Sequence, residues 1–183
     1  MSRLAIPAAI ELAPAASRPL LEAVKKQFGS TPNLFRLVSN SPAALEGYLG
    51  LSAALGKGSL PAKTHERIAL AVAEVNGCAY CLSAHTYIGK NLLKLDDAEI
   101  AANRHGGSAD ATADAAVRFA VQVAEQRGHV SDEALQAVKA AGHDDAQIVE
   151  IVLHVALNTW TNYVNEVAKT EIDFPAIDVR RAG

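Results

Sequence analysis

The residues best suited to chemistry lie together near the middle of the chain. Its two cysteines, Cys78 and Cys81, are three positions apart, and His85 follows four positions later. On a helix that begins at Cys78, these side chains share one face over about two turns. Two thiols at this spacing can cycle between dithiol and disulfide, and the positive end of a helix favours the thiolate. The segment therefore predicts a redox site, with Asn76 or Gly77 as the cap of its helix.

Two other interpretations fit the same residues. Cys78, Cys81 and His85 provide three zinc ligands, and Glu66 or a distant histidine such as His154 would have to supply the fourth. A second C-x-x-C or H-x-x-H pair, which zinc sites of this kind usually need, is missing from the sequence. Alternatively, the cysteines are buried structural residues beside a hydrogen-bonded histidine.

A second helix is predicted just upstream, over residues 61–75. Pro61 suits its first turn, and an apolar stripe runs along it. Glu66 lies near its middle, beside His65 and Arg67. A glutamate at this place is either solvated, paired with a basic neighbour such as Arg67, or part of the cysteine site, and spacing alone leaves all three open.

The whole chain is predicted to be all-α. Alanine and leucine are abundant, aromatic residues make up 5% of the chain, and β-branched runs between turn residues are nearly absent. Turn residues divide the sequence into about eight helices. We expect an extended N-terminal arm over residues 1–16, with Ser17 as the cap of the first helix, and a single helical domain over residues 17–183. The helical segments are residues 17–28, 33–39, 43–55, 61–75, 78–93, 96–104, 110–126, 132–141 and 144–170.

The last of these segments is the longest and is apolar on more than one face. This pattern predicts contact with several neighbouring helices or with a second subunit. His154 lies on its apolar stripe, where we expect a hydrogen-bonded core histidine. Asn158, Asn162 and Asn165 share one face, which favours hydrogen bonds between helices or subunits over a role in a pocket.

Charge and composition exclude several classes of partner. The formal net charge is −3, and acidic and basic residues are interspersed, so there is neither a basic stripe for nucleic acid nor a polybasic membrane anchor. Charged residues and prolines interrupt the apolar N-terminal region, which predicts no signal peptide and no spanning segment. We expect a cytoplasmic protein, where a close cysteine pair indicates catalysis or metal binding rather than a structural disulfide.

The motif as a whole resembles the alkylhydroperoxidase AhpD-like family of the carboxymuconolactone decarboxylase superfamily. The likeness is carried by residues 60–89, in which Glu66 precedes Cys78 by twelve positions and Cys78-Ala79-Tyr80-Cys81 is followed by His85. Thr31 to Phe35, Asn162 to Asn165 and Asp173 to Pro175 extend it to about three quarters of the chain. Tyr80 stands where the best-known members have histidine. In having a tyrosine at this position, the chain is similar to a sister group of peroxidase-related proteins.

The resemblance implies a proton relay and a reaction. Glu66, Cys78, Tyr80, Cys81 and His85 would form the relay, in which glutamate acts on the first cysteine and the histidine, and the second cysteine reduces a hydroperoxide. Residue chemistry alone leaves open which cysteine attacks, because thioredoxin-type pairs use the first. Tyr80 either takes part in proton transfer or packs its ring beside the pair.

The resemblance also implies partners. The disulfide would be reduced by an external dithiol on a lipoyl-bearing or thioredoxin-like protein, without a metal, flavin or haem cofactor. The chain would form a homo-oligomer, which in the family is a dimer, trimer or hexamer. Alternative functions are a non-enzymatic redox sensor or assembly module, or decarboxylase-like chemistry without a redox pair, against which both cysteines argue.

Overall fold

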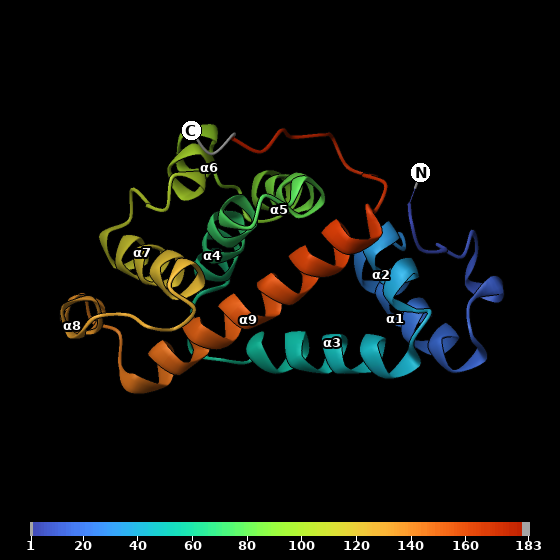
Figure 1. Cartoon of the computed structure of the whole chain (residues 1–183), viewed down its shortest axis with the longest axis horizontal. Helices are drawn as coiled ribbons and strands as arrows, with labels where there is room; N and C mark the ends of the chain where they lie inside the picture. The colour runs from blue at the N-terminus through green and yellow to red at the C-terminus, as the bar shows by residue number, and fades with distance from the viewer. Residues whose placement is uncertain (1, 181–183) are drawn as a thin grey trace.

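The computed structural model describes residues 2–180, which contain nine α-helices, two short 3-10 helices and no β-strand (Figure 1). The predicted all-α class is therefore confirmed. The α-helices correspond one to one to the nine segments that the turn residues delimit, although the overall count was predicted as about eight. The helices are α1 (Arg18–Phe28), α2 (Asn33–Val38), α3 (Pro42–Leu55), α4 (Ala62–Val75), α5 (Ala79–Asn91), α6 (Asp97–Arg104), α7 (Ala111–Glu125), α8 (Asp132–Ala140) and α9 (Asp145–Ala168).

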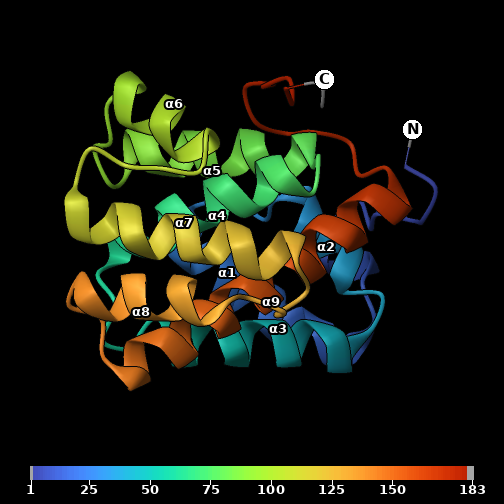
Figure 2. The same cartoon turned by 60° about the vertical axis from the view of Figure 1, so that its left-hand side comes forward.

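Helix α4 lies at the centre and packs against α5, α6, α7 and α9 (Figures 1 and 2). Its side chains Ile68, Leu70 and Val72 are completely buried. These three residues enter two hydrophobic clusters, one towards α5 and the N-terminal segment and one towards α7 and α9. Burial on several sides holds α4, and the polar side chains it carries, in a fixed position.

Helix α9 crosses the molecule between α3 and the α4–α5 pair (Figure 1). It begins with a capping box, in which Asp144 and Gln147 exchange hydrogen bonds with each other's backbone. As predicted, it contacts several neighbours. A second apolar face remains exposed, made of Val149, Val152, Leu153, Trp160, Tyr163 and Val167.

The start of α5 differs from the prediction in one respect. The chain turns after α4 at Gly77, which has a left-handed φ of 67°. The cap of α5 is Cys78 rather than Asn76 or Gly77, and its sulfur accepts the backbone N–H of Cys81 at 3.4 Å. Since a thiol replaces the usual hydroxyl or carboxylate cap, sequence rules for capping do not find it.

The N-terminal arm is less extended than predicted. It contains 3-10 helices at Ile10–Leu12 and Ala15–Ser17, and Ile10 and Ala13 are buried against the core. Ser17 does not cap α1 with its side chain. Its hydroxyl donates instead to the carbonyl of Ser39 at 2.7 Å, because the residue is fully buried where the arm meets the end of α2.

After α9 the chain runs back over α5 towards α6 (Figure 1). Asp173 accepts the backbone N–H of Asn33 at 2.8 Å, and the N–H of Ile177 donates to the hydroxyl of Ser83 at 2.9 Å. Near its end, the carbonyl of Asp178 accepts from Arg104 at 2.8 Å. This C-terminal strap, residues 170–180, is therefore fastened to α2, α5 and α6.

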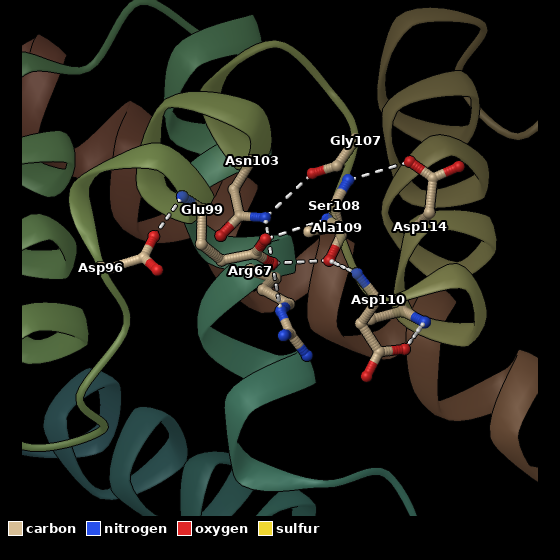
Figure 3. Close-up of polar contacts among 10 residues, drawn as sticks. Arg67, Asp96, Glu99, Asn103, Gly107, Ser108, Ala109, Asp110 and Asp114 are labelled. Carbon is tan, nitrogen blue, oxygen red and sulfur yellow. Dashed lines mark hydrogen bonds and ion pairs between the residues drawn. The ribbon is translucent and has the colours of Figure 1, made fainter.

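A buried carboxylate fastens α6 to α4 (Figure 3). Glu99 accepts from Arg67 of α4 at 2.7 Å, and the other donors to it are Asn103, the hydroxyl of Ser108 and the N–H of Ala109. Burial alone would raise the pKa of Glu99, but these donors outweigh it and lower the pKa to about 2. Arg67, one of the alternative partners predicted for Glu66, is thereby engaged elsewhere.

No helix among residues 2–180 is both long and apolar enough to span a membrane.

Candidate active site

The two cysteines occupy the first turn of α5. Cys78 is the cap residue and is fully buried, whereas Cys81 lies one turn into the helix and is 3% exposed. Both are free thiols. The positive end of the helix dipole and the unpaired N–H groups of the first turn favour a negative charge on the sulfur of Cys81.

Glu66, which is buried, and His85, which is half-buried, form a pair next to the cysteines. Because α4 and α5 pack side by side, Glu66 Oε1 lies 2.9 Å from His85 Nδ1. Burial alone would lower the pKa of His85, but the charge of Glu66 and the hydrogen bond to it raise the pKa. The charge of Cys81, which lines the same cavity as His85, raises the pKa of His85 further.

Two asparagines of α9 complete the surroundings of Cys81. The amide of Asn165 donates to the sulfur of Cys81 at 3.2 Å. The Oδ1 atom of Asn162 accepts a hydrogen bond from Asn76 at 2.9 Å. Its buried Nδ2 atom has no hydrogen-bond partner among residues 2–180, and it lies near the sulfur of Cys81. The helix contact of Asn162 was predicted, whereas the role of Asn165 at the sulfur was a minor alternative.

These contacts distinguish the two thiols. The hydrogen bond from Cys78 is the largest influence that lowers the pKa of Cys81, and His85, Asn162 and Asn165 act in the same direction against burial. The same hydrogen bond, together with burial, raises the pKa of Cys78. Cys81 is therefore the cysteine that ionises first.

Tyr80 lies beside Cys81 and lines the same cavity, but its hydroxyl is engaged by groups outside the Glu66–His85 pair. Its hydroxyl accepts the N–H of Leu34 at 3.0 Å and donates to Asp173 at 2.9 Å, and its ring packs edge-on against Phe174. Tyr80 thus joins α5 to the start of α2 and to the C-terminal strap. The structure gathers Glu66, Cys78, Cys81 and His85 in one place and directs the Tyr80 hydroxyl to another.

A cavity with two adjoining lobes lies over these residues. The first, which we call the cysteine lobe, has a volume of about 420 Å³ and is lined by Cys81, His85 and an apolar wall that includes Phe28, Phe35 and Phe174. The second, the histidine lobe, has a volume of about 390 Å³ and is lined by Glu66 and His85 together with His65 and His154. Cys78 lines neither lobe.

His154 is buried as predicted, but the hydrogen bond expected for it is missing. Its ring stacks on that of His65 with the centroids 4.1 Å apart, and the Nε2 atom of each ring has no hydrogen-bond partner among the described residues. Burial and the neighbouring His65 lower the pKa of His154 to about 4. Both rings therefore present polar atoms to the histidine lobe.

Metal ligands do not converge in this part of the chain: no group of three or more His, Cys, Asp or Glu side chains within residues 2–180 is arranged to hold an ion. Cys81 and His85 line the same lobe, Cys78 touches Cys81, and Glu66 is bonded to His85 rather than to the sulfurs.

Comparison with known proteins agrees with this architecture. The model of the carboxymuconolactone decarboxylase family matches residues 42–126. An uncharacterized protein of Haemophilus influenzae is 46% identical over 63 residues, which are 34% of this chain and 50% of that protein. The chain thus spans about half the length of the curated relative that it matches.

Solved structures match over nearly the whole chain. An AhpD-core, peroxidase-related protein of Ralstonia eutropha superposes with a TM-score of 0.83 at 23% identity, covering 94% of this chain and 92% of that one. A peroxidase-related protein of Silicibacter gives 0.80 at 21% identity, covering 93% and 91%. The debrominase Bmp8 gives 0.74 at 18% identity, covering 87% of each chain.

The chain therefore has the AhpD-like fold. The segment that carries Glu66, Cys78, Cys81 and His85 belongs to the carboxymuconolactone decarboxylase family. The predicted AhpD-like fold is therefore confirmed, and the match of residues 42–126 agrees with the predicted family.

Proposed function

We propose that the protein is a thiol peroxidase that reduces organic hydroperoxides with Cys81. The observation that carries this proposal is the unequal placement of the two thiols. Cys81 lines the cavity beside His85, whereas Cys78 lies buried behind it and touches Cys81 from the protein side. Such an arrangement supports an attacking thiolate and a resolving thiol.

The Glu66–His85 pair would prepare the nucleophile. Glu66 raises the pKa of His85, so that His85 takes up the proton of Cys81 and the resulting imidazolium faces a thiolate. Asn165 and the N-terminus of α5 stabilise that thiolate further. Tyr80 would act as a positioning residue that holds α5 against α2 and the strap.

The reaction then runs in two balanced steps. The thiolate of Cys81 attacks the terminal oxygen of the hydroperoxide, the O–O bond breaks, and the departing oxygen takes up a proton and leaves as an alcohol. Cys81 becomes a sulfenic acid. The thiol of Cys78 displaces its hydroxyl as water and gives the disulfide, which an external dithiol on a lipoyl-bearing or thioredoxin-like protein reduces. A reducing compartment such as the cytoplasm suits this cycle.

Steady-state kinetics would test the proposal. With dihydrolipoamide as donor, the wild type should consume cumene hydroperoxide over many turnovers, and Cys81→Ser and Cys78→Ser should each abolish turnover. A wild type that forms its disulfide once but does not turn over with either a lipoyl or a thioredoxin-type donor would contradict a peroxidase. That result would favour the redox sensor instead.

A second candidate is reductive dehalogenation of a small aromatic compound. The aromatic wall of the cysteine lobe suits a flat ring, and the debrominase Bmp8, one variant of which has been solved with 2,3,4-tribromopyrrole, has the same fold. In such a reaction the two thiols become a disulfide, and the ring exchanges bromine for hydrogen with release of bromide and a proton. Bromide release from 2,3,4-tribromopyrrole without hydroperoxide consumption would favour it.

A further inference from the structure

The two lobes of the cavity share a wall. In the proposed reaction, the leaving oxygen needs a proton, which has to come from a group close to that oxygen. Six residues line both lobes, and the cysteine lobe contains Cys81 while the histidine lobe contains Glu66. A peroxide whose terminal oxygen reaches Cys81 therefore has its second oxygen close to this shared wall. The shared residues are Gln27, Phe28, Phe35, Tyr48, His85 and Thr161.

Two of the four polar side chains of the shared wall, Thr161 and His85, are already engaged. The hydroxyl of Thr161 donates to the carbonyl of Asn158 at 2.9 Å. His85 is bound to Glu66 and, in the proposed reaction, holds the proton that compensates the thiolate. Gln27 lies on the exposed rim at the end of α1.

Tyr48 is the exception. None of the side-chain hydrogen bonds within residues 2–180 uses its hydroxyl, in contrast to that of Tyr80, which is bound on both sides. The Tyr48 ring is held between those of Phe35 and Trp160, with centroid distances of 5.7 and 5.4 Å. Aromatic packing of this kind fixes the ring of Tyr48, which lines both lobes.

The surroundings keep this hydroxyl protonated. Burial, and then the negative charges of Cys81 and Glu66, raise the pKa of Tyr48. Both charges have to be near the ring to act in this way. An alkoxide is nevertheless a stronger base than a tyrosinate, so Tyr48 can still give its proton to a departing alkoxide.

We propose that Tyr48 is the general acid of the peroxidase reaction, a role that rests on the function proposed above. As the sulfur of Cys81 bonds to the terminal oxygen and the O–O bond breaks, the electron pair leaves with the alkoxide, which takes the proton of the Tyr48 hydroxyl. The tyrosinate then recovers a proton from the imidazolium of His85, which had received it from Cys81. The sum is one hydroperoxide and one thiol converted to one alcohol and one sulfenic acid.

Two oxidants that differ in their leaving groups test this role. Cumene hydroperoxide releases an alkoxide, which needs a proton, whereas peracetic acid releases acetate, which does not. Single-turnover oxidation of Cys81 would be followed for the wild type, for Tyr48→Phe and for Tyr163→Phe, a control on the outer face of α9. We expect Tyr48→Phe to slow the reaction with cumene hydroperoxide about 100-fold and that with peracetic acid less than about threefold.

The possible results are distinct. Equal slowing with both oxidants, or no slowing with cumene hydroperoxide, overturns the role of Tyr48 and leaves the peroxidase function intact. A wild type whose Cys81 is not oxidised by cumene hydroperoxide overturns the peroxidase function itself and the role of Tyr48 with it. Thermal unfolding of each variant controls for a general loss of structure.

Discussion

At the scale of residues, the site depends on making Cys81 ionise before Cys78. The two thiols are adjacent on one helix turn, and the groups that separate them come from other elements: His85 and Glu66 from the α4–α5 contact, and Asn165 from α9. His85 and Asn165 act on the sulfur of Cys81 through charge and hydrogen bonding, and Glu66 acts through His85. Removing one at a time should therefore raise the pKa of Cys81 without changing the fold.

The substitution Glu66→Gln tests whether the negative charge of Glu66 lowers the pKa of Cys81 through His85. Gln keeps the shape but removes the carboxylate that raises the pKa of His85, so that His85 loses its proton at lower pH and no longer compensates the thiolate. We expect Cys81 to react with hydroperoxide about 100-fold more slowly at pH 7, and the midpoint of its alkylation by iodoacetamide to move to higher pH. Glu74→Gln is the matched control, since Glu74 is buried on the same helix but paired with Arg104. An unchanged alkylation midpoint in Glu66→Gln would refute the role of Glu66.

The substitution Asn165→Ala tests the hydrogen bond that Asn165 donates to the sulfur of Cys81. Loss of a donor to a buried anion costs about 1.5–3 kcal/mol, which corresponds to an increase in the pKa of Cys81 of roughly one unit or more. The pKa of Cys81 is measured from the thiolate absorbance at 240 nm as a function of pH. Asn158→Ala is the comparison, because the amide of Asn158 donates to the carbonyl of His154 and not to sulfur. Equal pKa values of Cys81 in the two variants would contradict this account.

At the scale of elements, α4 positions the site, and the buried carboxylate of Glu99 holds α6 and the following loop against it (Figure 3). Arg67 of this network is the direct neighbour of Glu66 in the sequence. The network therefore contributes both to stability and to the position of α4.

Glu99→Gln should destabilise the protein by roughly 2–4 kcal/mol, because it leaves Arg67 without its buried partner. The pKa of Glu99 is lowered on folding, so its contribution is complete above the ordinary pKa of 4.5 and is lost as the pH falls towards about 2. Urea unfolding between pH 7 and pH 3 should therefore show a weaker dependence on pH in the variant. The exposed Glu46→Gln serves as control, and a stability of Glu99→Gln equal to that of the wild type would disprove the role of the network.

Contacts between elements also limit how much of the site can be predicted from the sequence. The spacing of Cys78, Cys81 and His85 within one helix predicts their shared side, because helix geometry alone decides it. The partner of Glu66 depends on how α4 and α5 pack, and spacing leaves it open between Arg67 and the site. The only sequence feature that points to Asn165 as a site residue is the row of asparagines on an otherwise apolar helix. No sequence feature points to Tyr48, which lies on a different helix. Such contacts between elements distant in the sequence follow from tertiary packing, which local patterns do not encode.

At the scale of the whole molecule, α9 carries an apolar face that the other described residues of the chain leave exposed. Val149 and Val167 are 67% and 66% exposed and lie near opposite ends of the helix. Burial of such a face against another copy of the chain would be favourable. We therefore expect a homo-oligomer, a dimer, trimer or hexamer, that uses this face.

Sedimentation equilibrium would test the assembly. The wild type should have a mass above the 19.2 kDa of one chain, and the double variant Val149→Lys, Val167→Lys should sediment as a smaller species with an unchanged circular dichroism spectrum. Leu12→Lys, also at an exposed leucine but far from α9, should leave the mass unchanged. A wild-type monomer, or a double variant with the wild-type mass, would contradict assembly through α9.

The most direct test of the central claim, that Cys81 attacks and Cys78 resolves, is to trap the sulfenic acid. One equivalent of cumene hydroperoxide is added to the reduced protein with dimedone present, and the products are mapped by mass spectrometry. We predict a dimedone adduct on Cys81 in Cys78→Ser, no adduct in Cys81→Ser and an intramolecular disulfide in the wild type. An adduct on Cys78 in Cys81→Ser, with Cys81 unmodified in Cys78→Ser, would contradict the account.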